Sequence, residues 1–386
     1  MKAWGLLLFI AIVTIIYGLV NYYIFSRSVQ VFPSGSPYRG WFIFIFWGIA
    51  SSFVLARILE RVYPCGLTGA ITWIGSFWLA FMVYFFLIVI LVDLVRLSDH
   101  FFHWLPSFVF SDYQKTKSIL LAVSVTIVAL VVLVGFINAR NPVIRELNLR
   151  INKKADGLQT LSIVMVSDIH LGTIISKRKA TRLVTTINSL KPDIVLLAGD
   201  IVDEDLAPVI KNDLGKSLSA IHSQLGVFAI TGNHEYIGGA DPAIQYLEQH
   251  GITMVRDTAL FVDNKFYLAG RDDRDKPRFT GKNRKTLEDI IQEVDPAYPI
   301  ILMDHQPFAL GKTAALGVDL SLSGHTHHGQ LWPFNYITSA IYEISHGYKQ
   351  IGKTHFYVSS GFGTWGPPVR LGNRPEIVYI KLTFNH

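Results

Sequence analysis

Polar residues that could bind metal ions or transfer protons follow several apolar, β-branched stretches in the second half of the chain. Carboxylate, amide and imidazole groups bind divalent metals, and imidazole also acts as a general acid or base. In a single loop such residues usually form a turn or a cap, but five loops of the same ligand types indicate a metal centre. The residues are Asp168, His170, Asp200, Asn233, His234, His305, His325 and His327.

Seven of these side chains, all except His234, are too many for one tetrahedral ion and suit two ions that share a bridging carboxylate. Mixed imidazole and carboxylate ligands favour Mn, Fe, Zn, Co or Ni over Mg or Ca. Two divalent ions bring four positive charges and the two aspartates remove two, so the remaining charge attracts a phosphate ester. Cys65 is the one cysteine, which excludes an internal disulfide framework and thiolate metal clusters.

The elements that must position these residues alternate from about residue 151. Each polar cluster follows an expected strand, and the carboxyl ends of strands are where open α/β sheets bind ligands. In an extended segment, residues two apart point the same way, so Asp168 with His170, and His325 with His327, can each offer two ligands. The pattern predicts a layered α/β domain with helices at 177–189, 208–222, 242–250 and 285–293. Strands are expected at 163–166, 194–198, 227–231, 266–269, 300–303, 320–323, 356–359 and 377–382.

The first part of the chain has a different composition. Half of all 386 residues are apolar, and four uncharged stretches lie before residue 140, at 3–25, 40–56, 64–92 and 118–139. A cleaved signal peptide is a weaker explanation for the first stretch, because it lacks a cleavage pattern and three more stretches follow. We therefore expect four transmembrane helices in a multi-pass protein of the cell membrane. If both ends of the chain are cytosolic, the cytosolic side carries eight basic residues and the outer side five. This bias favours a cytosolic catalytic domain.

Part of the net charge of +6 lies in the basic run that follows the last apolar stretch. This position indicates contact with anionic lipid head groups of the bilayer rather than with nucleic acid. The expected organisation is a transmembrane region at 1–140, a basic juxtamembrane linker at 141–157 and a catalytic domain at 158–386.

The segments "SDIHLG", "AGDIVD", "GNHE", "MDHQP" and "SGHTHHGQ" resemble the ordered motifs of the calcineurin-like metallophosphoesterases. The resemblance covers about residues 158–386, and "SSGFGTWGPPVRLGNRPEI" is similar to the membrane-associated bacterial branch of that family. It implies a four-layer α/β sandwich, two mixed sheets flanked by helices. His328 departs from the pattern, because relatives usually carry glycine there; it could narrow the mouth, bind metal or donate a proton.

Carried over by position, the resemblance implies two metal sites that share Asp200. One site would be formed by Asp168, His170, Asp200 and His327, and the other by Asp200, Asn233, His305 and His325. A metal-bridging hydroxide would attack phosphorus, and His234 would face the scissile phosphate and stabilise or protonate the leaving oxygen. Manganese is the favoured ion.

The expected function is a membrane-anchored, dinuclear metal-dependent phosphoesterase. The alternatives are a membrane scaffold or sensor with a non-catalytic domain, which the complete ligand set disfavours, and an accessory domain of a transporter. A phospholipid or lipid-linked pyrophosphate is the favoured substrate, because the aromatic run Trp332-Pro333-Phe334 follows the last ligands. Its proline excludes a regular central strand, so we expect these aromatic side chains to be partly exposed beside the site. Phe362 and Trp365 are expected at the same rim, whereas Tyr336 and Tyr342 are expected to pack inside.

Overall fold

The computed structural model describes residues 3–63 and 65–385, which divide into two compact units. One unit runs to Ile137 and also contains Gly366–Val369. The other contains Asn138–Trp365 and the residues from Arg370 onward. The first unit is helical, and the second carries both sheets.

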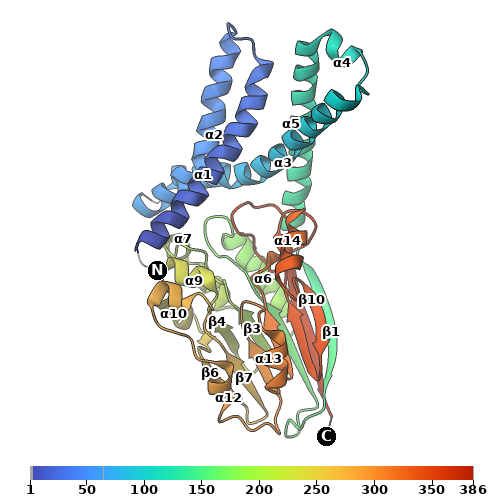
Figure 1. Cartoon of the computed structure of the whole chain (residues 1–386). Coiled ribbons are helices and arrows are strands. Elements are labelled where there is room, and N and C mark those ends of the chain that lie inside the picture. The colour runs from blue at the N-terminus through green and yellow to red at the C-terminus, as the bar shows by residue number, and fades with distance from the viewer. Residues whose placement is uncertain (1–2, 64, 386) are drawn as a thin grey trace. The chain divides into compact units, whose positions relative to one another are not determined.

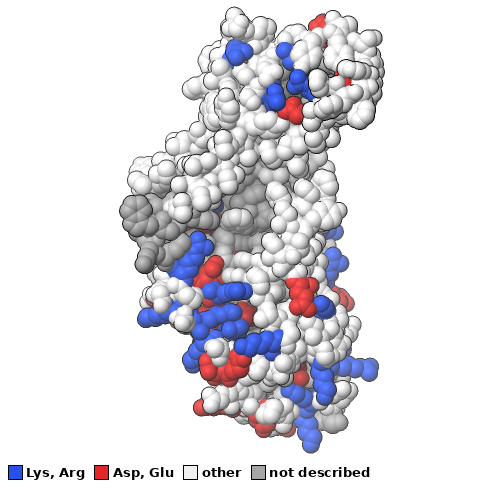
Figure 2. Space-filling view, viewed as in Figure 1, with Lys and Arg blue, Asp and Glu red and all other residues white. Residues whose placement is uncertain are grey.

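Four long apolar helices make up most of the first unit, as the sequence predicts (Figure 1). On the face shown in Figure 2, several charged side chains gather at one end of this unit, and most of its other described surface is uncharged. Each helix is long and apolar enough to cross a membrane. The helices are α1 (Ala3–Ser28), α2 (Pro37–Val62), α3 (Gly66–Phe102) and α5 (Tyr113–Ala139), with the short η1 (Val29–Val31) and α4 (Phe108–Ser111) between them.

The helix α3 continues well beyond the apolar stretch that ends at residue 92. Charged residues do not end a helix by themselves, and here Asp93 and Arg96 form an i,i+3 ion pair at 3.6 Å. The helix ends at His103, whose left-handed backbone (φ 47°) places its N–H on the Asp99 carbonyl.

Aromatic side chains hold α1, α2 and α3 together. The rings of Phe46 and Trp78 meet edge to face at 5.3 Å, and the Trp78 indole N–H donates to Asn21 Oδ1 at 2.9 Å. A Cβ at Gly75 would come within 2.5 Å of the Phe53 Cα, so glycine is what allows α3 to approach α2 this closely.

The second unit contains two six-stranded mixed sheets. The first has the order β1-β12-β2-β3-β4-β5, in which only the β12–β2 pair is antiparallel. Its strands are β1 (Val143–Ile151), β12 (Glu376–Phe384), β2 (Thr160–Val166), β3 (Ile194–Ala198), β4 (Val227–Ile230) and β5 (Thr253–Met254).

The second sheet has the order β10-β11-β9-β8-β7-β6, with a parallel centre and an antiparallel strand at each edge. Its strands are β10 (Gly347–Ile351), β11 (Thr354–Val358), β9 (Leu320–Ser323), β8 (Ile300–Met303), β7 (Phe266–Gly270) and β6 (Thr258–Val262).

The two sheets pack face to face, and helices cover their outer faces (Figure 1). Side chains such as Ile163 of β2 and Leu322 of β9 share the central core. The next residue of β2, Val164, points the opposite way into a core with the helices, as strand alternation requires. The first sheet is covered by α6 (Lys177–Ser189), α7 (Ala207–Lys211), α8 (Leu214–Leu218) and α10 (Ala240–Gln249). On the second sheet lie α12 (Leu287–Ile291) and α13 (Leu310–Ala315).

The fold class is confirmed, with two local differences from the sequence-based expectation. Residues 141–157, expected as a linker, contain β1, an edge strand paired with β12. Leu147, Leu149 and Ile151 alternate with polar residues in this strand, which is the period-2 pattern of a strand with one buried face, but the expectation of a linker rested on the basic residues of the segment. The helix expected at 208–222 is two short helices, because the left-handed Asp213 (φ 49°) breaks it.

Candidate metal centre

The loops after five strands bring the predicted ligands together at the carboxyl ends of both sheets. Asp168 and His170 follow β2, and Asp200 follows β3. The first turn of α9 (Asn233–Gly238) follows β4, His305 follows β8, and His325 with His327 follow β9. At these strand ends, side chains from sequence-distant loops lie close enough together to form groups that could hold metal ions.

These loops are not extended, contrary to the sequence-based expectation. Asp168 and His170 have φ values of 51° and 52°, and His325 and His327 have φ values of 71° and 45°. Left-handed backbone is uncommon outside glycine, although aspartate and histidine adopt it more readily than most residues. The reversals turn each loop sharply at the strand end while both members of each pair still reach the cluster.

Asp168, His170 and His327 form one set of potential metal ligands, and all three are buried. The Nε2 atoms of His170 and His327 lie 3.1 Å apart, and His327 Nε2 lies 3.4 Å from Asp168 Oδ1. Asp168 is held by the His325 backbone N–H, which donates to both of its carboxylate oxygens at 3.0 and 3.1 Å. Three ligand atoms therefore converge on one place.

Asp200, His305 and His325 form a second set. His305 Nε2 lies 3.1 Å from Asp200 Oδ2, and His325 Nδ1 lies 2.8 Å from Asn233 Oδ1. Asp200 also lies 3.9 Å from His170 Nε2, a member of the first set. This central position suits a carboxylate that bridges two ions.

The chemistry of these donors fits divalent metals. The His305 Nδ1 atom lies 2.8 Å from the Ala198 carbonyl, which can only accept, so Nδ1 carries the proton. Nε2 is then the atom that faces the cluster, and it is buried without a hydrogen-bond partner in the described structure. Burial opposes a charge on His305, but the nearby Asp200 and Asp168 outweigh it and raise its pKa well above the usual range. The surroundings of Nε2 thus favour a cation.

His325 and His327 are held in the neutral form that binds metals. Burial, and then the neighbouring charge of His305, lowers the pKa of His325 to about 3. Burial, and then the guanidinium of Arg370, holds the pKa of His327 well below its usual range. Neutral imidazole is the metal-binding form of histidine.

His234 lies beside the cluster and is buried. Its ring is edge-on to that of His170 at 4.5 Å and to that of Trp365 at 5.9 Å. Its Nδ1 lies 3.2 Å from Asp203 Oδ1. Burial opposes a charge on His234, but Asp200 and Asp203 outweigh it and raise its pKa to about 9.

Asp203 is a site residue that the motif analysis missed, although it belongs to the quoted segment "AGDIVD". Its Oδ1 faces Nδ1 of both His234, at 3.2 Å, and His170, at 3.7 Å. The three residues also form a third set that could hold a metal ion. Because Asp203 faces Nδ1 of each ring, it orients both imidazoles.

Glu235, the last residue of "GNHE", ties two of the loops together. Its carboxylate accepts from the backbone N–H of Asp200 at 3.2 Å and of Gly232 at 2.7 Å. It also accepts from Ile201 and Val202 at 2.7 and 2.9 Å. A Cβ at Gly232 would overlap Asp200 Oδ1, so only glycine allows this approach. Glu235 therefore positions the Asp200 loop against the Asn233 loop.

Arg370 was also missed, and it is fully buried behind His327. Its Nη2 lies 3.1 Å from His327 Nδ1, and its remaining donors reach the carbonyls of Gly363 and Ser360 and the side chain of Asn373. Nothing local in "PPVRLGN" distinguishes this arginine from a surface residue. Only its contact with His327, which lies 43 residues earlier in the chain, shows that it belongs to the site.

Other expectations for the rim have mixed outcomes. Trp332 and Phe334 are partly exposed, at 50% and 37%, and Trp365 reaches His234 as expected. Phe362 instead lies in the core and Tyr336 is exposed, which reverses both expectations. His328 lies with Nδ1 2.9 Å from Ser345 Oγ and belongs to none of the described sets of potential metal ligands.

Comparison with known proteins accounts for this geometry. The calcineurin-like phosphoesterase family model matches residues 161–329, which contain all of the predicted ligands. An uncharacterized metallophosphoesterase of Aquifex aeolicus is 33% identical over 58% of this chain and 85% of its own length. This chain belongs to the calcineurin-like metallophosphoesterases.

Two other relatives extend into the helical unit. An uncharacterized metallophosphoesterase of Campylobacter jejuni is 29% identical over 97% of this chain and 98% of its own length. A bovine transmembrane protein with a metallophosphoesterase domain is 31% identical over 72% of this chain and 66% of its own length. The family and the clustered ligands support a metal-dependent hydrolase, and the four apolar helices indicate a membrane protein.

Proposed function

We propose that this metallophosphoesterase hydrolyses phosphate esters or pyrophosphates at the membrane with two divalent ions. The observation that carries the proposal is the convergence of seven ligand-type side chains and His234 from five strand ends. Asp168, His170 and His327 would hold one ion, His305, His325 and Asn233 the other, and Asp200 both.

Bound divalent ions would generate a strong nucleophile from water at neutral pH and neutralise charge on the phosphoryl oxygens. Manganese is the ion that we favour for this set of imidazole and carboxylate ligands. Asp203 and Glu235 would not touch the substrate; they hold the imidazoles and the Asp200 loop in place.

His234 would supply the proton. Asp203 Oδ1 lies 3.2 Å from its Nδ1, and this carboxylate favours the protonated ring, which can donate to the leaving oxygen. Trp365 shields one side of the ring. The Trp365 backbone N–H donates to Gln330 Oε1 at 2.9 Å, and Gln330 Nε2 donates to the Trp365 carbonyl at 3.0 Å, so Gln330 holds Trp365 in place. Loss of a general acid typically lowers the rate by about 10²–10⁴-fold.

The substrate that we favour carries its phosphate on a lipid. The helix α14 (Phe334–Ile341) starts seven residues after His327 and has no buried residue. Its exposed Tyr336, Ile337 and Ile341 add to the apolar surface of Trp332 and Phe334. Exposed apolar clusters of this kind usually mark contact with a membrane, a partner or a ligand.

The activity test uses the purified full-length protein in detergent, with Mn²⁺ or with EDTA. The substrates are a phosphate monoester, a chromogenic diester and a lipid-linked pyrophosphate. Replacing Trp332 and Phe334 with serine should slow hydrolysis of the lipid and spare the chromogenic diester. An equal loss on both would contradict the lipid substrate, and absence of hydrolysis of every substrate with Mn²⁺ would favour a non-catalytic scaffold.

We also propose that the four helices are spans of the cell membrane and that the catalytic domain is cytosolic. Basic residues from Arg140 to Lys154 support this orientation. A protease added to intact cells should leave the C-terminal domain uncut and should cut it after the cells are opened. Cleavage in intact cells would place the domain outside.

A further inference from the structure

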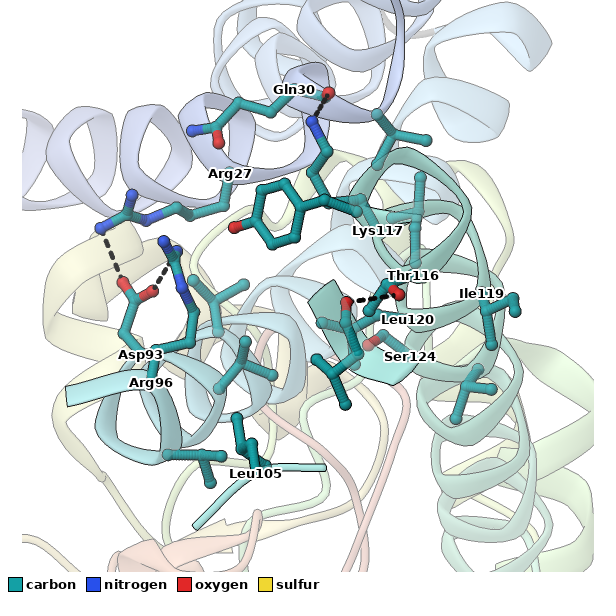
Figure 3. Close-up of a pocket in the computed structure, with 18 of the residues that line it drawn as sticks. Arg27, Gln30, Asp93, Arg96, Leu105, Thr116, Lys117, Ile119, Leu120 and Ser124 are labelled. Carbon is teal, nitrogen blue, oxygen red and sulfur yellow. Dashed lines mark hydrogen bonds and ion pairs between the residues drawn. The ribbon is translucent and has the colours of Figure 1, made fainter. Parts of the chain in front are cut away.

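The helical unit contains an open cavity of about 1430 Å³ that no step of the proposed reaction uses. It is lined by α1, α3, α4 and α5 and the segments that join them (Figure 3). Apolar side chains form its walls, among them Phe85, Val89 and Val92 of α3 and Leu120 and Val123 of α5. A cavity with apolar walls in an apolar helical unit suits hydrocarbon chains.

One part of the cavity is polar and basic. Arg27 and Arg96 both point toward the single carboxylate of Asp93, at 2.8 and 3.6 Å (Figure 3). Asp93 also accepts from the Tyr23 hydroxyl at 2.6 Å. Two guanidinium groups thus share one carboxylate, which leaves one positive charge uncompensated at this point.

Lysines add to this positive charge. The Lys117 ammonium donates to the neutral Gln30 carbonyl at 3.0 Å and lies 5.1 Å from the Tyr113 ring centre, and Lys115 also lines the cavity. The other two lining carboxylates, Asp99 and Asp112, accept backbone N–H groups at 2.7 and 2.9 Å. The cavity therefore has four cationic side chains against three carboxylates, and two histidines, His100 and His103, also line it.

We propose that this cavity binds an anionic phospholipid of the bilayer, separately from the metal centre. Its phosphate would be bound by Arg96, Arg27 and Lys117, and an acyl chain would lie along Val89, Val92 and Leu120. Guanidinium groups suit phosphate because they donate two parallel hydrogen bonds to it. The apolar walls favour a lipid over free phosphate, because a free ion would leave them without a ligand.

The test measures how much lipid the purified full-length protein retains from micelles that contain equal amounts of phosphatidylglycerol and phosphatidylcholine. The wild type should retain phosphatidylglycerol preferentially. The variant Arg96→Gln with Lys117→Gln should retain about tenfold less, since one hydrogen bond to a charged group changes affinity by about that factor or more. Arg39→Gln is the matched control, because Arg39 donates to the Phe32 carbonyl at 2.8 Å but does not line the cavity.

A second variant keeps the cations and fills the space. Val89→Trp should also reduce retention of phosphatidylglycerol, which a general effect of surface charge would not do. Equal retention of the two lipids by the wild type, or unchanged retention in both variants, would overturn the proposal. Displacement of the lipid by inorganic phosphate at a concentration equal to that of the lipid would assign the site to a free anion instead.

Discussion

Substitution of Glu235 tests how strongly the metal loops depend on one buried carboxylate. Glu235 is 1% exposed, and its two oxygens accept four backbone N–H groups. In Glu235→Gln the amide keeps one accepting oxygen and places an NH₂ group against the two remaining N–H groups. Each lost hydrogen bond to a charged group costs about 1.5–3 kcal/mol, so the two together cost about 3–6 kcal/mol.

The assay is thermal unfolding of the purified protein in EDTA, which separates folding from metal binding. For a domain of this size each kcal/mol corresponds to about 2–4 °C in Tm, so Glu235→Gln should lower Tm by about 6–24 °C. Glu248→Gln, an exposed substitution on the neighbouring α10, should change stability by less than about 0.5 kcal/mol. A Glu235→Gln variant that unfolds at the wild-type temperature would refute the assigned role of this carboxylate.

Two further predictions concern the site residues His234 and Asp203, and a third concerns Asp273, a buried residue whose carboxyl group accepts from the side-chain NH₂ of Gln306 at 3.0 Å. His234→Ala should keep the metal content of the wild type and lose about 10²–10⁴-fold in kcat, and elemental analysis showing loss of both ions would contradict its role as a proton donor. Asp203→Asn should move the fall of kcat at high pH to a lower pH, because Asp203 helps to keep His234 protonated; an unchanged profile would show that Asp203 has no such influence. Burial raises the pKa of Asp273 to about 7, so the folded protein binds more protons than the unfolded chain between about pH 4 and 7, and stability falls as pH rises through that window. In EDTA, Asp273→Asn should therefore be more stable than the wild type above pH 7, by an amount on the order of 4 kcal/mol. The variant should lose this advantage near about pH 4. A difference in stability that does not depend on pH would contradict the raised pKa of Asp273.

The sequence predicts the central strands well, and the residues proposed as ligands lie close together at the ends of these strands. The strands β3 and β8 lie where expected because they are short apolar runs buried on both faces. The strand β9 is buried throughout as well, although serine alternates with leucine in it. Their carboxyl ends then determine where the ligands lie. The edge strand β1 was missed although its apolar residues recur at every second position, because its basic residues were interpreted as a juxtamembrane linker.

Residues whose role depends on distant contacts could not be predicted. Arg370 looks like a surface cation until the fold places its guanidinium against His327. Glu235 and Asp203 lie within recognised motifs, but their hydrogen bonds and ion pairs join loops that only the tertiary structure brings together. The left-handed backbone of the ligand loops likewise follows from loop packing, not from local preference alone.

Metal stoichiometry together with activity tests the central claim most directly. Wild-type protein stripped with EDTA and then given Mn²⁺ should bind two ions per chain by elemental analysis and regain phosphoesterase activity in parallel. Asp200→Asn, which alters the carboxylate placed between both sets of ligands, should bind fewer ions and stay inactive. Hydrolysis that persists unchanged in the stripped wild type, or full metal content in Asp200→Asn, would contradict a dinuclear centre bridged by this residue.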